Sequence, residues 1–256
     1  TFLRSEVKEL YGGADIIWYD PTSSDDRAMF IYREGQSTLA FYGYEWAGVD
    51  RTNGKSVYYV NDPTDPKAGD FLYNGRGATY DYNQANYTII GNAVPKVYGG
   101  VNTSVSWKGI DLAMSFTYKI GGSLYDGAYM DVADDGYYWE RIHAKNYYDN
   151  LWTPSNPDGT EPRIEGVDLT DAQQYSSRHV HNASYLRLKT LSLGYTLPRR
   201  WTRKASISSA RLFFNGSNLW TIAKYKDADP EVSEYGTRGW ETPLGKTFVF
   251  GIELKF

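Results

Sequence analysis

Cysteine is absent from the 256 residues, so the sequence supports neither a disulfide framework nor thiol chemistry. Long apolar runs are also missing: none approaches the roughly 18 residues of a membrane helix, which excludes helical spans but not alternating strands. A basic excess is lacking too, because the net charge is −4, and this argues against a nucleic-acid partner. The chain starts at Thr1 without a signal peptide, which predicts a processed or partial chain.

Aromatic residues are abundant, at 16% of the chain, and the last eleven residues show how they are placed. In "KTFVFGIELKF" apolar and mostly polar positions alternate, as expected for a strand whose two faces meet different surroundings. That apolar face fits either the core of a soluble sandwich or the lipid side of a barrel. Its members are Phe248, Phe250, Ile252, Leu254 and Phe256, against Thr247, Val249, Gly251, Glu253 and Lys255.

Four further stretches show strand periodicity. Residues 97–107 and 110–120 alternate on both sides of the short turn Lys108-Gly109, which predicts a hairpin. Residues 191–197 and 210–221 predict two more strands, the second with Leu212 and Phe214 on its apolar side. Upstream, one long or interrupted strand is predicted between about 28 and 47.

The connections between these strands alternate in length. Those at 108–109 and 198–207 are short, whereas 49–95, 121–183 and 223–245 are long and polar. All short turns fall on the side of the C-terminus, the pattern of outer-membrane barrels with short periplasmic turns and long extracellular loops. We therefore predict an all-β, antiparallel transmembrane β-barrel. Six strands are fewer than the minimum of about eight, so the missing strands are expected in chain preceding Thr1.

Six segments, in order along the chain, resemble characteristic blocks of one family. They are "FYGYEWAGVDRTNGKSVYYV", "GNAVPKVYGGVNTSVSWKGIDLAMSFTYKIGG", "NLWTPSNP", "NASYLRLKTLSLGYTLP", "NGSNLWTIAKYKDADPE" and "TFVFGIELKF". The family is the SusC/RagA group of TonB-dependent outer-membrane transporters. The resemblance spans about 35–256 and covers only the C-terminal part of such a protein.

The resemblance implies the following expectations. Residues 1–256 are the C-terminal portion of a barrel of about 22 strands, without the plug domain and the N-terminal strands. The whole protein imports glycans or peptides across the bacterial outer membrane, together with a SusD-like surface lipoprotein and TonB. Its further partners are the remainder of the barrel, the plug and membrane lipid. The C-terminus is periplasmic, and Phe256 resembles the signal read by the outer-membrane assembly machinery.

Aromatic residues in the stretch 121–183 are the candidates for binding a substrate or a partner. Rings beside carboxylates suit the apolar faces and hydroxyl edges of sugars, but Tyr and Trp also pack loops and protein interfaces. Both interpretations stay open. The candidates are Tyr125, Tyr129, Tyr137, Tyr138, Trp139, Tyr147, Tyr148 and Trp152.

Other motifs favour ordinary structural roles. "YMDVADDG" lacks the spacing of a calcium loop, and His179 and His181 lack a third metal ligand nearby, so no metal site is predicted. No catalytic constellation and no cofactor motif is present, so we expect a protein that is not an enzyme. Interfacial girdles predict membrane-boundary positions for Trp107, Trp201 and Trp220. The basic run from Arg199 to Lys204 is expected in a solvated periplasmic turn that could also meet lipid phosphate.

Two alternatives to a transporter remain at this stage. A non-transporting, β-rich surface protein that binds glycans would also have long aromatic loops. A glycoside hydrolase would need two carboxylates at a defined separation, and no motif supports it.

Overall fold

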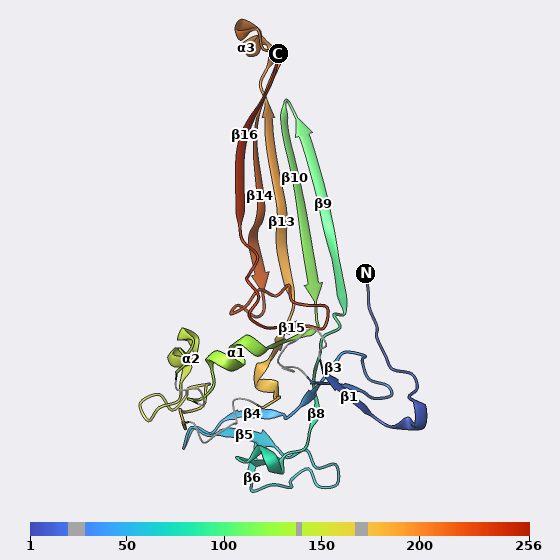
Figure 1. Cartoon of the computed structure of the whole chain (residues 1–256), viewed down its shortest axis with the longest axis vertical. Helices are drawn as coiled ribbons and strands as arrows, with labels where there is room; N and C mark the ends of the chain where they lie inside the picture. The colour runs from blue at the N-terminus through green and yellow to red at the C-terminus, as the bar shows by residue number, and fades with distance from the viewer. Residues whose placement is uncertain (20–28, 137–139, 167–173) are drawn as a thin grey trace.

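The computed structural model describes residues 1–19, 29–136, 140–166 and 174–256. Its main feature is a tall, open sheet of five antiparallel strands in the order β16-β14-β13-β10-β9 (Figure 1). Among the described residues, no helix has the length and the apolar character needed to cross a membrane. The sheet strands are β9 (Val97–Trp107), β10 (Ile110–Ile120), β13 (Tyr185–Thr196), β14 (Ser209–Ala223) and β16 (Thr247–Lys255).

The strand register gathers apolar side chains on one face of the whole sheet. Because side chains alternate and antiparallel partners share a face, one apolar row must be followed by one polar row. One such row joins Phe250, Phe214, Leu193, Leu112 and Val105 across all five strands. The next row, on the opposite face, joins Val249, Asn215, Ser192, Ala113 and Ser104. The predicted faces of these five strands, with Leu212 and Phe214 on the apolar side, are confirmed.

A β-bulge in β13 keeps this division intact. Strict alternation from Leu191 would place Lys189 and Arg187 on the apolar face. Instead the register with β10 shifts: Ser115 pairs with Thr190 and Phe116 with Leu188, so Lys189 is an extra residue. Beyond a bulge, each side chain of the strand lies on the face opposite to the one that strict alternation would give it. Arg187 therefore lies opposite Thr117 on the polar face.

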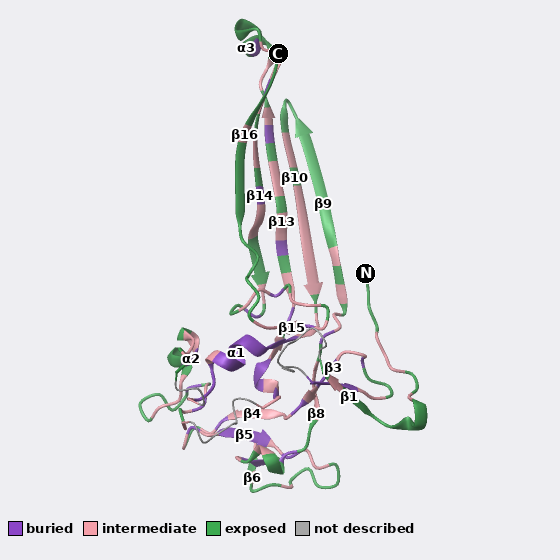
Figure 2. Ribbon diagram, in the orientation of Figure 1, coloured by how far each residue is buried: buried purple, intermediate pink, exposed green. Residues whose placement is uncertain are grey.

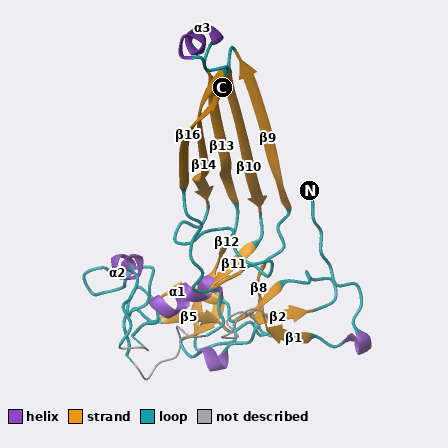
Figure 3. Cartoon of the chain, turned by 45° about the horizontal axis from the view of Figure 1, so that its top comes forward, coloured by secondary structure: helices purple, strands orange, loops and turns teal. Residues whose placement is uncertain are grey.

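Most of the remaining described chain folds at the other end of the sheet, away from the C-terminus, into what we call the loop domain (Figures 1 and 3). It comprises the described residues of 1–96, 121–184 and 224–246. One of its sheets has the order β1-β2-β3-β8 and another the order β4-β5-β7-β6. Their strands are β1 (Ile16–Tyr19), β2 (Met29–Tyr32), β3 (Ala40–Gly43), β8 (Thr88–Asn92), β4 (Trp46–Val49), β5 (Ser56–Tyr59), β7 (Arg76–Thr79) and β6 (Phe71–Tyr73).

A third, three-stranded sheet adjoins the main one. In it β11 pairs antiparallel with β12 and parallel with β15, so segments far apart in the chain meet there. Short helices complete the fold, and one of them, α3, lies at the C-terminal end of the main sheet (Figure 1). The bounds are β11 (Ser123–Asp126), β12 (Val180–Asn182), β15 (Thr237–Arg238), α1 (Gly127–Val132), α2 (Lys145–Asn150) and α3 (Arg199–Thr202), with 3-10 turns η1 (Tyr11–Gly13), η2 (Tyr82–Gln84), η4 (Ser177–His179) and η5 (Arg203–Ala205).

The prediction of one long or interrupted barrel strand between about 28 and 47 is wrong for its described residues, because none of them joins the main sheet. Its described residues form β2, β3 and β4, which belong to sheets of the loop domain. Met29, Phe30 and Ile31 are buried in succession, so both faces of β2 are covered, unlike a strand with one lipid face and one watery face. Figure 2 shows the buried residues concentrated in the loop domain, while the main sheet is largely exposed or intermediate.

The stretches 49–95 and 121–183, predicted as long polar loops, contain short strands and helices and bury part of their described side chains. Phe30 and Phe41, with ring centroids 4.9 Å apart, pack with Ala93 and Tyr125 in one buried cluster. This cluster joins residues from both long stretches, so the loop domain has a hydrophobic core of its own.

Candidate functional site

A buried arginine organises the part of the loop domain that follows β11. Arg178, in η4, has a side chain only 2% exposed and donates to both carboxylate oxygens of Asp135, at 2.9 Å each. It also donates to Glu161 at 2.9 Å and to the Ala133 carbonyl at 3.1 Å. These bonds hold Arg178, residues 133–135 and Glu161 in one arrangement. Any movement that separates them would leave a buried charge without its partner, which is costly.

Two tyrosines complete this network. Tyr147 donates to Asp135 at 3.3 Å, and Tyr129 donates to Glu161 at 2.8 Å. Burial raises the pKa of Asp135 to about 6, an effect that the positive charge of Arg178 opposes. Burial also raises the pKa of both tyrosines, and the nearby carboxylates raise it further, so their hydroxyls stay protonated as donors.

Asp126 fixes the start of α1 and connects it to residues about 100 positions later in the sequence. It accepts from the backbone N–H of Tyr129 at 2.9 Å, a helix N-cap contact. It also accepts from the Tyr225 hydroxyl at 2.8 Å and from Arg238 at 2.6 Å. Residues 224–246 are thereby held against 121–132.

Arg187 connects the segment 224–246 to the polar face of the main sheet. Its side chain is 3% exposed and forms ion pairs with Asp229 and with Glu231, the latter at 2.6 Å. Lys189, the bulge residue, also reaches Glu231 at 3.0 Å. These ion pairs therefore link the polar face of the main sheet to the loop domain.

The predicted aromatic candidates fall into two groups. Tyr125, Tyr129 and Tyr147 are buried inside the loop domain, at 2%, 8% and 0% exposure, which leaves almost no ring surface for a ligand. Tyr148 is 52% exposed, and the half-buried Trp152 donates through its ring N–H to the Arg51 carbonyl at 3.0 Å. Tyr148 and Trp152 remain candidates for contact with a substrate or partner. Tyr137, Tyr138 and Trp139 lie outside the described residues.

The acidic and histidine motifs take structural positions. Asp131 pairs with Arg141 at 2.9 Å, and Asp134 lies 2.7 Å from the Nε2 of His143. His179 is buried, and His181 stacks on the ring of Tyr225 with centroids 3.9 Å apart. In the described ranges no three His, Asp or Glu side chains are grouped so as to hold a metal ion.

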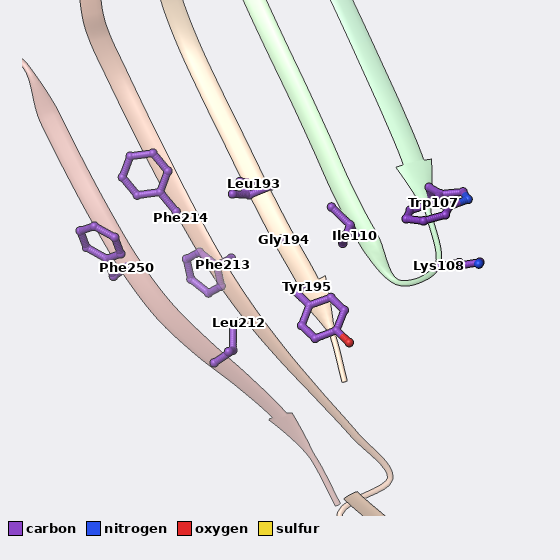
Figure 4. A pocket seen from close by; sticks show the side chains of 10 residues that line it. All are labelled: Trp107, Lys108, Ile110, Leu193, Gly194, Tyr195, Leu212, Phe213, Phe214 and Phe250. Atoms are coloured by element: carbon purple, nitrogen blue, oxygen red, sulfur yellow. The ribbon is translucent and has the colours of Figure 1, made fainter. Parts of the chain in front are cut away.

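The apolar face of the main sheet ends in aromatic residues near the C-terminal rim. A shallow hollow of ≈ 630 Å³ there is lined from all five strands, including Trp107, Ile110, Leu193, Leu212 and Phe250 (Figure 4). The three tryptophans predicted at strand ends are exposed, at 63% for Trp107, 54% for Trp201 and 41% for Trp220. Phe256 is 88% exposed at the end of the chain.

Sequence reasoning missed the charged networks of Arg178, Asp126 and Arg187. Arg178 and Asp135 are 43 residues apart, and Asp126 and Arg238 are 112 apart, so no local spacing links them. The position of Arg187 could have been found from the sequence, because Leu186 and Leu188 alternate out of phase with Leu191 and Leu193. That change of phase marks the bulge.

Comparison with known proteins gives consistent matches in sequence and structure. No family model matches the chain. A TonB-dependent receptor P3 of Formosa agariphila is 28% identical over 90% of this chain and 23% of its own length. The TonB-dependent receptor SusC of Bacteroides thetaiotaomicron is 24% identical over 100% of this chain and 24% of its own length.

Solved structures agree. One described as the RagAB peptide transporter matches with a TM-score of 0.73 and 29% identity, over 98% of this chain and 26% of that chain. A RagAB peptide importer in an "open-open" state matches with a TM-score of 0.72 and 28% identity, over 98% of this chain and 25% of that one. The chain thus spans about a quarter of the relatives that it matches. These relatives are named as receptors and transporters, not as enzymes.

Proposed function

We propose that this chain, which is SusC/RagA-like and corresponds to the C-terminal part of such receptors, belongs to an outer-membrane nutrient importer. It would form part of the barrel wall and part of the extracellular cap above the barrel. The main sheet would be the wall and the loop domain part of the cap. The observation that best supports this proposal is the division of the five-stranded sheet into one apolar and one polar face. A wall between lipid and a watery lumen needs this division.

The β9 edge of the sheet supports its continuation into a larger barrel. Beside β9, the backbone nitrogen of Thr1 donates to the Tyr98 carbonyl at 2.8 Å, and Phe2 forms an antiparallel bridge with Val97. We propose that chain preceding Thr1 continues this pairing along β9 and supplies the remaining strands and the plug. The proposed domain assignment of 1–256 is therefore the C-terminal portion of the barrel with its loops.

The two alternative functions fit the sheet less well. A water-soluble surface protein that binds glycans would leave the apolar row around Phe250, itself 77% exposed, in contact with water. A glycoside hydrolase is not supported by the relatives, which are receptors and transporters. We propose import of oligomeric nutrients, either peptides or glycans. RagAB is described as a peptide transporter, and SusC matches this chain over its full length.

The proposed topology places the loop domain outside the cell and the C-terminal rim in the periplasm. It predicts that Lys67→Cys, in the loop domain, reacts with a membrane-impermeant maleimide on intact cells. Lys204→Cys, in the turn between β13 and β14, should react only after the outer membrane is permeabilised. Both lysines are exposed in the structure, so accessibility within the fold does not separate them.

Quantitative labelling before and after permeabilisation measures this difference, in the longer protein with cysteines elsewhere replaced. We expect Lys204→Cys to label at under about a tenth of its permeabilised level, while Lys67→Cys changes little. Equal labelling of both positions on intact cells would reverse or abolish the proposed orientation.

A SusD-like lipoprotein is the proposed partner, resting on a loop domain with exposed aromatics such as Tyr148 and on the similarity to SusC and RagAB. We expect the receptor that contains this chain to co-purify with such a lipoprotein in mild detergent. Gel filtration followed by mass spectrometry of the receptor peak measures this. A receptor peak without lipoprotein, from membranes that contain it, would count against the partner.

A further inference from the structure

The turn between β13 and β14 carries four cations on a short helical segment. Arg199 and Arg200 lie in α3, and Arg203 and Lys204 in η5. The segment projects beyond the end of the main sheet (Figure 1). It is an ordered turn: Thr202 is 5% exposed, and its carbonyl accepts from the Ile207 N–H at 3.2 Å. The turn therefore brings the backbone positions of four cations together, with their side chains exposed.

Three of these cations line one hollow. Arg200, Arg203 and Lys204 line an open hollow of ≈ 540 Å³, to which no other described residue contributes. Within the described parts of the chain, none of the three has a carboxylate within 4.0 Å. Elsewhere Arg187 and Arg211 are paired with acids. Like charges gathered without counter-charge repel each other, so an anion placed between them would be stabilised.

The surroundings of the hollow indicate where that anion comes from. Trp201, beside it, is 54% exposed, and the Arg200 guanidinium carbon lies 5.7 Å from its ring centroid. The neighbouring β9–β10 hairpin repeats the pair, with Lys108 Nζ 4.7 Å from the ring of Trp107 (Figure 4). Trp at headgroup depth beside Lys or Arg is the pattern of a membrane boundary.

We propose that Arg200, Arg203 and Lys204 bind the headgroup phosphate of an anionic phospholipid at the C-terminal rim. This inference rests on the proposed function, in which the adjoining apolar face meets lipid. A headgroup with net negative charge is favoured over a zwitterionic one, because the latter carries its own cation into a hollow that is already positive. The acyl chains then lie along the apolar face, beside Trp201 and Trp107.

The test uses the full receptor in nanodiscs of equal parts phosphatidylglycerol and phosphatidylcholine. After transfer to mild detergent, native mass spectrometry counts the retained lipids. We expect the parent to retain phosphatidylglycerol preferentially. Replacing Arg200, Arg203 and Lys204 together by Gln should lower its retention at least tenfold, since each cation near an anionic surface contributes about a fivefold factor. Replacing Arg51, Lys67 and Lys226 by Gln, which removes the same charge in the loop domain, should leave retention unchanged.

Each outcome decides a separate point. A receptor that folds in the nanodisc but shows no phosphatidylglycerol preference, or keeps it in the triple variant, overturns the headgroup site and leaves the proposed function intact. Displacement of phosphatidylglycerol by inorganic phosphate at equal concentration overturns the lipid as the source of the anion. A receptor that does not enter the nanodisc at all contradicts the proposed function itself. Heat-modifiable migration of the triple variant checks that it folds.

Discussion

Replacing Phe250 by Arg is expected to destabilise the folded barrel by about 2–4 kcal/mol, the cost of an arginine at the lipid midplane. Phe250 lies near the middle of β16, opposite Phe214 in the apolar row, and its side chain is 77% exposed on that face. If the face meets lipid, the new charge has no water to solvate it. Heat-modifiable migration and urea titration of the refolded receptor in lipid measure the loss.

Glu253→Gln on the same strand is the matched control. Glu253 lies opposite Arg211 on the polar face and is 3.3 Å from Lys255, in a pair that is largely exposed. Loss of an exposed pair costs about 0–1 kcal/mol. A stable Phe250→Arg variant together with an unstable Glu253→Gln variant would show that the two faces are exchanged, and stability of both variants would show that the strand lies in water.

Replacing Arg178 by Met is expected to destabilise the loop domain by about 3–5 kcal/mol, because it leaves the buried carboxylate of Asp135 and the partly buried one of Glu161 without their counter-charge. The affected groups are Asp135 and Glu161, both at 2.9 Å from the guanidinium. Arg51→Met is the control: its pair with Asp158 is more than three-quarters exposed on both sides and is worth about 0–1 kcal/mol. Hydrogen exchange should show faster exchange at 121–166 in the variant, with the main sheet unchanged.

The pH dependence of the Arg178→Met effect has a defined sign. Burial raises the pKa of Asp135 from 3.8 to about 6, so as the pH falls the folded state takes up this proton before the unfolded state does. The penalty of the buried carboxylate is therefore complete above about pH 6 and is relieved progressively as the pH falls toward 3.8. In the variant the opposing arginine is gone, so its deficit should be smaller at pH 5 than at pH 8. An equal deficit at both pH values would contradict the charge-based explanation.

The strands of the main sheet could be predicted from sequence because one physical cause fixes them. A strand with one apolar and one polar face must alternate with a period of two, and "KTFVFGIELKF" shows this alternation without any tertiary information. The turns at Lys108-Gly109 and after Thr196 are visible because the alternating runs stop there. The bulge at Lys189 shows in the sequence as a change of phase.

The loop domain could not be predicted in this way. In β2, Met29, Phe30 and Ile31 are buried in succession, so the strand lacks the alternation that distinguishes a wall strand. The packing of Phe30 on Phe41 and Tyr125 depends on contacts between segments far apart in the chain. Among the aromatic candidates, burial separates Tyr147 from Tyr148, although the two are neighbours in sequence and identical in chemistry.

The central claim is that the apolar face of the five-stranded sheet contacts lipid and the opposite face contacts water. Spin labels on single cysteines test it most directly, and this stretch contains no cysteine of its own to remove. In the full receptor in bilayers, labels at Phe248, Phe250 and Ile252 should be relaxed mainly by oxygen. Labels at Thr247, Val249 and Glu253 should be relaxed mainly by a water-soluble nickel complex. The account predicts this alternation with a period of two along β16; uniform access of the nickel complex to all six positions would contradict it.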